Sequence, residues 1–169
     1  SAQQKQQFVS VRGTNFITPD DKILALKGIN LGNWLLPEGY MFGFKKTNSP
    51  QKIYTAVNQL IGESEARRFW KRFRDNYITR ADIQFIKRAG FNSIRRPFNY
   101  RLFVSNNEPR KFEGAGYDLL DRVIGWCREE NLYVVLDMHA APGGQTGDNI
   151  DDSDGYPFLF ENAEDQQLS

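Results

Sequence analysis

An aspartate and the only histidine of the chain, Asp137 and His139, end an apolar run and precede a Pro-Gly-Gly loop. The run, residues 132–136, is typical of a strand that is buried on both faces, as in a parallel sheet covered by helices. Ligands and catalytic groups collect at the carboxyl ends of such strands. A hydrogen-bonded structural histidine is the alternative interpretation of His139, and the neighbouring strands have to decide between the two.

Two earlier segments, 23–31 and 91–97, are predicted to be strands of the same sheet, and Pro97 is expected to end the second one. Polar and aromatic residues lie at or beyond both ends: Asn30, Asn33, Trp34 and Glu38 in the first case, Arg95, Asn99 and Tyr100 in the second. Because neighbouring side chains alternate between faces, only one of Arg95 and Arg96 points inward. An inward arginine needs an anionic partner, a carboxylate whose pKa it would lower. A rim ion pair without a catalytic role is the alternative for Arg95.

Helices with clear end signals are predicted between the strands. Ser49-Pro50 begins a helix that Gly62 ends, and the capping box Thr79-x-x-Asp82 begins another that runs to Gly90. A helix between them has a basic side, predicted to be a solvated face. A further helix over 116–131 turns Cys127 inward as a small core residue. Residues 8–18 are expected to form a hairpin that turns at 13–15, and a final helix begins near Ala163.

Alternation of strands and helices predicts βαβ units, and hence an α/β fold. No Gly-x-Gly-x-x-Gly motif or phosphate loop follows a strand, so we expect no nucleotide cofactor and assign none of any kind. The remaining candidate is a (β/α)8 TIM barrel, which typically needs about 250 residues. We therefore expect a partial barrel: residues 1–22 as an N-terminal hairpin that caps the barrel bottom, and residues 23–169 as its first three β/α units.

The composition is that of a globular protein with no strong electrostatic field. Apolar residues make up 40% of the chain and charged residues 25%, and the net charge is +1. These values give no reason to expect nucleic acid or an anionic membrane as a partner. One cysteine excludes intrachain disulfides and zinc clusters. The 13 Phe, 7 Tyr and 3 Trp residues are mostly core, but an excess of aromatic residues also suits a sugar-binding cleft.

Three motifs in sequence carry a resemblance to glycoside hydrolase family 5, the cellulase and exo-glucanase family of retaining β-glycosidases. They are Leu-Lys-Gly-Ile-Asn-Leu-Gly-Asn-Trp-Leu at 26–35, Gly-Phe-Asn-Ser-Ile-Arg-Arg-Pro-Phe-Asn-Tyr at 90–100, and Leu-Asp-Met-His-Ala-Ala-Pro-Gly-Gly-Gln at 136–145. The resemblance runs from about residue 23 to the end of the chain. It looks closest to the exo-β-1,3-glucanase clade, from which Asn33 and Pro37 depart.

The resemblance implies a role for several residues. Arg95 matches the arginine that hydrogen-bonds the nucleophilic carboxylate, and His139 matches the histidine at the subsite where the bond is cleaved. Arg96 occupies a position that is usually aliphatic, which leaves open which of the two arginines faces inward. The residues expected to contact sugar are Glu38, Tyr40, Trp34, Asn99, Tyr100 and Asp148.

The implied mechanism is double displacement by two carboxylates about 5–5.5 Å apart. In the family these are glutamates after the fourth and seventh strands, the first of them in an Asn-Glu-Pro motif. The Asn107-Glu108-Pro109 segment has that motif but precedes His139, so it is interpreted as a polar surface turn. We therefore expect both catalytic glutamates to be missing from this chain and the chain alone to be inactive.

The resemblance and the open sheet edges also imply partners. The expected substrate is a β-glucan or a related oligosaccharide, and the expected protein partner is the complementary C-terminal half of the barrel or a second copy. Family resemblance suggests a secreted or periplasmic protein.

Three alternatives remain open at the level of sequence. The first is a carbohydrate-binding barrel fragment without catalysis, and the second is a metal-dependent hydrolase that uses Asp137 and His139. The third concerns the acidic loop 148–155, which resembles a calcium loop in composition but not in the spacing of its residues. A solvated acidic loop is the simpler interpretation, and no metal site is assigned.

Overall fold

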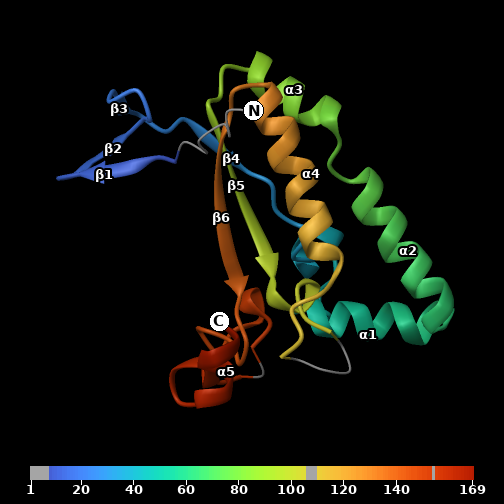
Figure 1. The fold of residues 1–169 in the computed structure, drawn as a ribbon. Helices are drawn as coiled ribbons and strands as arrows, with labels where there is room; N and C mark the ends of the chain where they lie inside the picture. The colour runs from blue at the N-terminus through green and yellow to red at the C-terminus, as the bar shows by residue number, and fades with distance from the viewer. Residues whose placement is uncertain (1–7, 106–109, 154) are drawn as a thin grey trace.

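The computed structural model describes residues 8–105, 110–153 and 155–169, which form two small sheets and a layer of helices (Figure 1). The first sheet is antiparallel, in the order β1 (Ser10–Arg12), β2 (Asn15–Ile17) and β3 (Ile23–Leu24). The second is parallel, in the order β4 (Gly28–Asn30), β5 (Ser93–Asn99) and β6 (Tyr133–Ala140). The antiparallel sheet lies near the amino-terminal ends of the parallel strands, and the chain ends near their carboxyl-terminal ends.

The strand predicted over residues 23–31 is wrong as one element, because the segment divides between the two sheets. Residues 23 and 24 pair with β2, whereas residues 28–30 pair with β5. The intervening residues are held by Asn92, whose side chain accepts a hydrogen bond from the Lys27 amide at 2.7 Å and donates one to the Ala25 carbonyl at 2.8 Å. An apolar pattern cannot show that a strand changes partners, so periodicity alone merged the two pieces.

The prediction that Pro97 ends the second strand is also wrong. β5 continues through Pro97 to Asn99 and pairs with β6 throughout, with Pro97 opposite Asp137. The backbone of Arg95 faces β4, since its carbonyl accepts from the Leu31 amide, and by alternation that of Pro97 faces the same way. β4 has already ended at Asn30, so the missing N–H of the proline leaves no ladder partner unpaired.

The helices begin and end at their sequence signals. Their bounds are α1 Pro50–Ile61, α2 Glu63–Asn76, α3 Arg80–Arg88, α4 Ala115–Glu129 and α5 Ala163–Leu168, with short 3₁₀ turns η1 Gly39–Phe42, η2 Tyr100–Leu102, η3 Asn149–Asp151 and η4 Phe158–Phe160. The Ser49 side chain accepts from the Lys52 amide, and the Asp82 carboxylate accepts from the Thr79 amide at 2.7 Å. Both predicted N-caps are confirmed. Among the described residues, no helix combines the length and apolar character that crossing a membrane requires.

The core lies between the parallel sheet and the helices on one side of it (Figure 1). Ile94, Ile83 and Val123, from β5, α3 and α4, are completely buried there together with Cys127. Burial raises the pKa of the Cys127 thiol to about 12, which agrees with a packing role rather than a nucleophilic one.

The second face of the sheet and its edges are largely open. Val135 and Leu136 of β6 point to opposite faces, yet they are 43% and 47% exposed. Ile29 of β4 is 40% exposed. β4 and β6 are the outer strands, and no strand in the described part of the chain pairs with their free edges. A parallel sheet is normally covered on both faces, so this surface is incomplete.

Arg96 is a buried cation within the core. It has no exposed surface, its guanidinium carbon lies 4.3 Å from the centroid of the Trp34 ring, and it donates to the Leu31 carbonyl. Two of its nitrogens, Nε and Nη2, have no hydrogen-bond partner among the described residues. Burial lowers the pKa of the guanidinium, the direction expected when a cation loses its hydration.

We predict that Arg96→Met stabilises the protein. Methionine keeps an apolar stem against Trp34 and removes a buried charge that pairs with no carboxylate in the described part of the chain. Such replacements are often neutral or stabilising by about 1–4 kcal/mol, and we expect a gain of about 1–2 kcal/mol in the free energy of unfolding. Chemical denaturation measures the change, with Arg68→Met on the exposed side of α2 as the control. A loss of stability would contradict the prediction.

Candidate functional site

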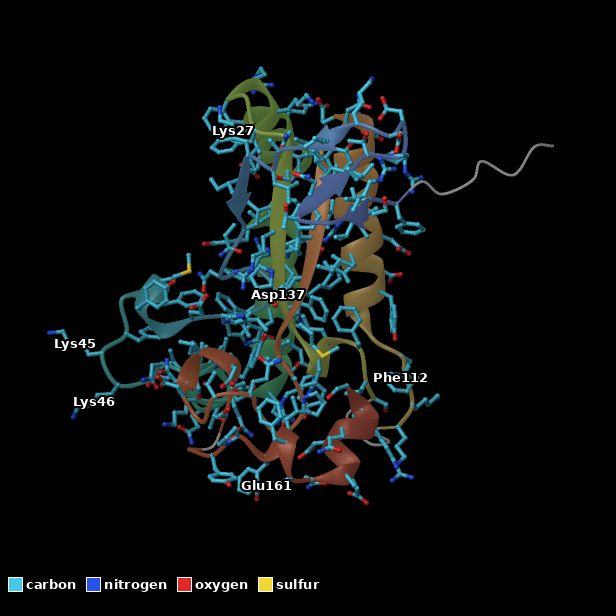
Figure 2. All side chains as sticks on the ribbon, turned by 90° about the vertical axis from the view of Figure 1, so that its left-hand side faces the viewer. Lys27, Lys45, Lys46, Phe112, Asp137 and Glu161 are labelled. Carbon is cyan, nitrogen blue, oxygen red and sulfur yellow. The ribbon has the colours of Figure 1, made fainter. Side chains whose placement is uncertain are left out.

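The Arg95 guanidinium joins polar groups from all three parallel strands on the open face of the sheet. It donates to the Asp137 carboxylate, and Nη1 donates to Asn30 Oδ1 at 3.0 Å. His139 Nδ1 lies 3.2 Å from Arg95 Nη2 and 3.1 Å from Asp137 Oδ2. Figure 2 views the molecule from the side away from the helices and labels Asp137 among the strands. The side chains of Arg95, Asp137 and His139 are 41%, 27% and 30% exposed, so a ligand can reach them.

Strand geometry explains why these groups meet. Arg95 and Arg96 point to opposite faces, and the structure resolves the ambiguity between them: Arg95 faces the site and Arg96 the core. Asp137 and His139 are two residues apart and so share a face. The pairing of β5 with β6 shifts after Phe98, which leaves His139 as an extra residue between paired positions. Such bulges re-aim side chains and are common beside active sites.

The imidazole is placed to serve either neighbour. In its neutral form, Nδ1 can accept a hydrogen bond from the Arg95 guanidinium. In its protonated form, Nδ1 can donate to the Asp137 carboxylate. The group therefore provides a fixed cation, a carboxylate and a proton-exchanging ring at one point of the open face.

Glu38 lies close enough to this group to feel its charge. Burial raises the pKa of Glu38 and outweighs three stabilising effects: the attraction of His139, a hydrogen bond from the Tyr40 hydroxyl and the attraction of Arg95. The negative charge of Glu38 raises the pKa of the Tyr40 hydroxyl, and loss of hydration and the hydrogen bond to Glu38 act in the same direction. Tyr40 is nevertheless 70% exposed. A carboxylate of raised pKa beside a cation and an exposed aromatic ring is suited to binding hydroxyl groups.

Asn33 fixes the segment that carries Glu38. It is 2% exposed and has a φ of 62°, in the left-handed region that asparagine tolerates. Its side chain accepts from the Glu38 amide at 3.0 Å and donates to the Tyr77 hydroxyl at 3.3 Å. Tyr77 in turn stacks on Phe73 of α2, with a centroid separation of 4.7 Å. Asn33 thus connects the loop after β4 to the aromatic residues of α2.

Two of the predicted sugar-contacting residues are buried, and the expectation for them is corrected. Trp34 is 1% exposed, with its indole N–H donating to the Arg74 carbonyl at 2.6 Å and its ring against Arg96. Asn99 is 2% exposed and donates to Asp152 at 3.0 Å. Neither offers a free surface to a ligand. Tyr100 is half-buried at the end of β5, and Asp148 is exposed and accepts from the Asn149 amide at 2.6 Å.

Asp137, Asn30 and Asp152 are contact residues for which reasoning from the sequence gives no place in the glycosidase site. The spacing Asp137-x-His139 held a usable signal, because residues two apart on a strand share a face. The long-range contacts of Asp152 left no signal, since its partners lie about 50 and 100 positions away.

The acidic loop after β6 uses its two buried carboxylates for hydrogen bonds within the protein. Asp151 accepts from the amides of Gln145 at 2.6 Å and Thr146 at 2.5 Å, and from the Ser153 hydroxyl at 2.6 Å. Burial acts to raise the pKa of Asp151, but these hydrogen bonds outweigh it and the pKa is lowered. Among the described residues, no group of three or more His, Cys, Asp or Glu side chains is arranged to hold a metal. Residues 107–109 and 154 lie outside the described residues.

A parallel sheet with helices on one side and a polar group on its open face defines an α/β protein, and comparison with known proteins gives the family. The profile of the glycosyl hydrolase family 5, Cellulase, matches residues 48–163. The chain belongs to this family. The predicted resemblance is thereby confirmed, and the family implies a (β/α)8 barrel of which this chain covers only part.

Relatives agree with this assignment. The chain is 34% identical over 160 residues to a β-xylosidase of Phanerodontia chrysosporium, covering 95% of this chain and 33% of the relative. It is 32% identical over 158 residues to a glucan 1,3-β-glucosidase of Candida oleophila, covering 87% and 36%. It is 40% identical over 80 residues to endoglucanase C of Acetivibrio thermocellus, covering 47% and 23%. The chain thus spans about a third or less of these relatives.

Solved structures support the fold. The crystal structure of AoRut superposes with a TM-score of 0.70 at 19% identity, covering 85% of this chain and 40% of that one. A rutinosidase from Aspergillus niger gives 0.69 at 20% identity, covering 83% and 40%.

We predict that His139→Gln raises the pKa of Glu38 further. The substitution removes the attraction of His139, which is the largest of the effects that favour the ionised Glu38 carboxylate. Carbon-13 NMR of the carboxyl group measures the pKa, and the resonance that disappears in Glu38→Gln identifies it.

Tyr40→Phe should act in the same direction, because it removes a hydrogen bond to the same carboxylate. Tyr156→Phe is the matched control, because the Tyr156 hydroxyl donates to Glu161 instead, and it should leave the pKa of Glu38 unchanged. An unaltered Glu38 pKa in His139→Gln would show that the two side chains do not interact.

Proposed function

We propose that this chain is the N-terminal portion of a retaining β-glycosidase that acts on β-glucan-type polysaccharides or oligosaccharides. The observation that carries the proposal is the convergence of Arg95, Asp137 and His139 on the open face of the parallel sheet, level with the carboxyl end of β4. Membership of a family whose relatives include a xylosidase, an endoglucanase and glucan 1,3-β-glucosidases supports the reaction class.

In this proposal the three parallel strands are the first three β/α units of the barrel. The site residues then have distinct roles. Arg95 faces the nucleophilic carboxylate, and His139 lines the subsite where the bond is cleaved. Glu38, Tyr40, Tyr100 and Asp148 contact sugar hydroxyl groups and ring faces.

The reaction proposed is double displacement. One carboxyl group protonates the leaving oxygen while a second carboxylate attacks the anomeric carbon, and water then releases the glycosyl group from it. Arg95 would hold the attacking carboxylate ionised and oriented. Both glutamates are proposed to lie outside residues 1–169, so this chain alone would not turn over substrate.

The exposed edges of β4 and β6 support a matching proposal about partners. Residues Ile29, Val135 and Leu136 expose apolar surface on the strands that a closed barrel would cover. The C-terminal half of the barrel, or a second copy of the chain, is proposed to cover them. A polymeric substrate also favours a secreted or periplasmic location.

We predict that Arg95→Met lowers kcat/KM of the full-length protein by about 100-fold or more, because a preorganised charge beside the nucleophile is lost. Arg95→Lys retains the charge but not the planar fork, so it should recover only part of the activity. Arg68→Met is the control on a remote exposed surface. Activity of Arg95→Met within about threefold of the unmodified protein would refute the role.

We predict that purified residues 1–169 release no sugar from aryl β-glycosides or soluble β-glucans, whereas the full-length protein does. Mixing the chain with the separately produced C-terminal half should restore turnover if the edges pair. Robust hydrolysis by residues 1–169 alone would overturn the proposed placement of the glutamates.

Calorimetry with the same glucans, run beside the activity assay, distinguishes the enzyme from a carbohydrate-binding barrel without catalysis. A non-catalytic carbohydrate-binding barrel predicts sugar binding without turnover even in the full-length protein. Binding accompanied by turnover supports the enzyme.

A further inference from the structure

The carboxylate of Asp152 contacts segments that follow the other two parallel strands: the start of α1, which comes after β4, and the end of β5 with the turn after it. Asp152 itself lies in the loop after β6, and its side chain is 5% exposed. Its Oδ1 accepts from the Gln51 amide at 2.8 Å, and its Oδ2 accepts from Asn99 Nδ2 at 3.0 Å. Arg101 Nε lies 3.6 Å from the same oxygen. Gln51 lies in the first turn of α1, which follows the loop after β4, and Asn99 is the last residue of β5.

The bond to Gln51 is specific to the start of a helix. The first amides of an α-helix have no partner within the helix, and Gln51 is the second residue of α1. The Asp152 carboxylate therefore satisfies a donor that the helix cannot satisfy itself. A negative charge at this end also interacts favourably with the helix dipole.

The neighbouring Asp151 provides the contrast. Its hydrogen bonds, to Gln145, Thr146 and Ser153, all stay within the loop after β6. Asp152 directs its bonds away from that loop, to two other elements. Asp152 also has a φ of 63°, in the left-handed region that aspartate tolerates better than most residues. Asp151 therefore stabilises the fold of the loop itself, whereas Asp152 connects the loop to α1 and β5.

A small cavity lies beside Asp152, between the segment after β5 and the loop after β6. Its volume is about 70 Å³, and it is lined from both the β5 and the β6 side, by Tyr100, Arg101, Ala141, Gly143, Gly144, Asp152 and Phe158. Tyr100 and the Asp148-bearing loop are the parts of the proposed sugar site that flank it. The hydrogen bond from Asn99 to Asp152 connects these two parts.

We propose that Asp152 is a positioning residue that fixes the loop after β6 to the start of α1 and the end of β5 and thereby sets the affinity for the sugar chain. It touches neither the Arg95 guanidinium nor the His139 imidazole among the contacts described, so it governs binding rather than bond cleavage. The kinetic part of this inference rests on the proposed function, whereas the structural part does not.

The test uses Asp152→Ala in the full-length protein, with two independent measurements. Hydrogen exchange should show the Gln51 amide exchanging at least about tenfold faster, because its acceptor is gone. KM for a soluble oligosaccharide should rise about tenfold while kcat stays within about twofold, since ordering of the binding loop is lost and the Arg95 site is intact. Asp121→Ala, an exposed aspartate on α4, is the matched control and should alter neither.

Asp152→Asn keeps an acceptor and loses the charge that faces Arg101. Its Gln51 exchange rate and its KM should therefore lie between those of the unmodified protein and Asp152→Ala. It also decides the matter if Asp152→Ala does not fold. Unchanged Gln51 exchange refutes the connection through Asp152, and faster exchange with an unchanged KM, or a fall in kcat alone, refutes its role in binding. An unmodified protein without glycosidase activity refutes the proposed function only, because the exchange measurement still tests the connection.

Discussion

The alternation of side chains along β5 is the constraint on which the site depends. It sends Arg95 to the open face and Arg96 into the core, so two adjacent cations meet opposite environments. On the open face the charge has a carboxylate, an amide oxygen and water. In the core it has an indole ring and one carbonyl. The first arrangement leaves the guanidinium within reach of a ligand, whereas the second lowers stability, because a buried charge loses its hydration.

Much of the fold could be predicted because its signals are local. Ser49-Pro50, the Thr79 capping box and the apolar run before Asp137 each act within a few residues, and each forms the expected element. The failures are non-local. Residues 23–31 divide between two sheets because of pairing partners, and Pro97 is tolerated because β4 ends before it. Neither fact is present in the segment concerned.

The site follows the same rule. Strand periodicity predicts that only one of Arg95 and Arg96 points inward, and the family resemblance matches Arg95, His139 and Glu38 to site positions. Trp34 could not be assigned to the core in this way, because a tryptophan beyond a strand end fits a sugar platform as well as an interior. Its burial depends on Arg96 and on the Arg74 carbonyl, contacts across 62 and 40 positions of sequence respectively. Asp152 was missed for the same reason.

Asp137 bears on the chemistry that Arg95 can perform in the proposed enzyme. A guanidinium offers several donors in one plane, and Asp137 and Asn30 already use part of that set. Their bonds fix the plane of Arg95 before any nucleophilic carboxylate arrives, so less conformational freedom is lost when it binds. The negative charge of Asp137 also weakens the attraction that Arg95 exerts on a second carboxylate. The nucleophile would then be held ionised by geometry and hydrogen bonding as much as by net charge, because one cation is shared between two anions.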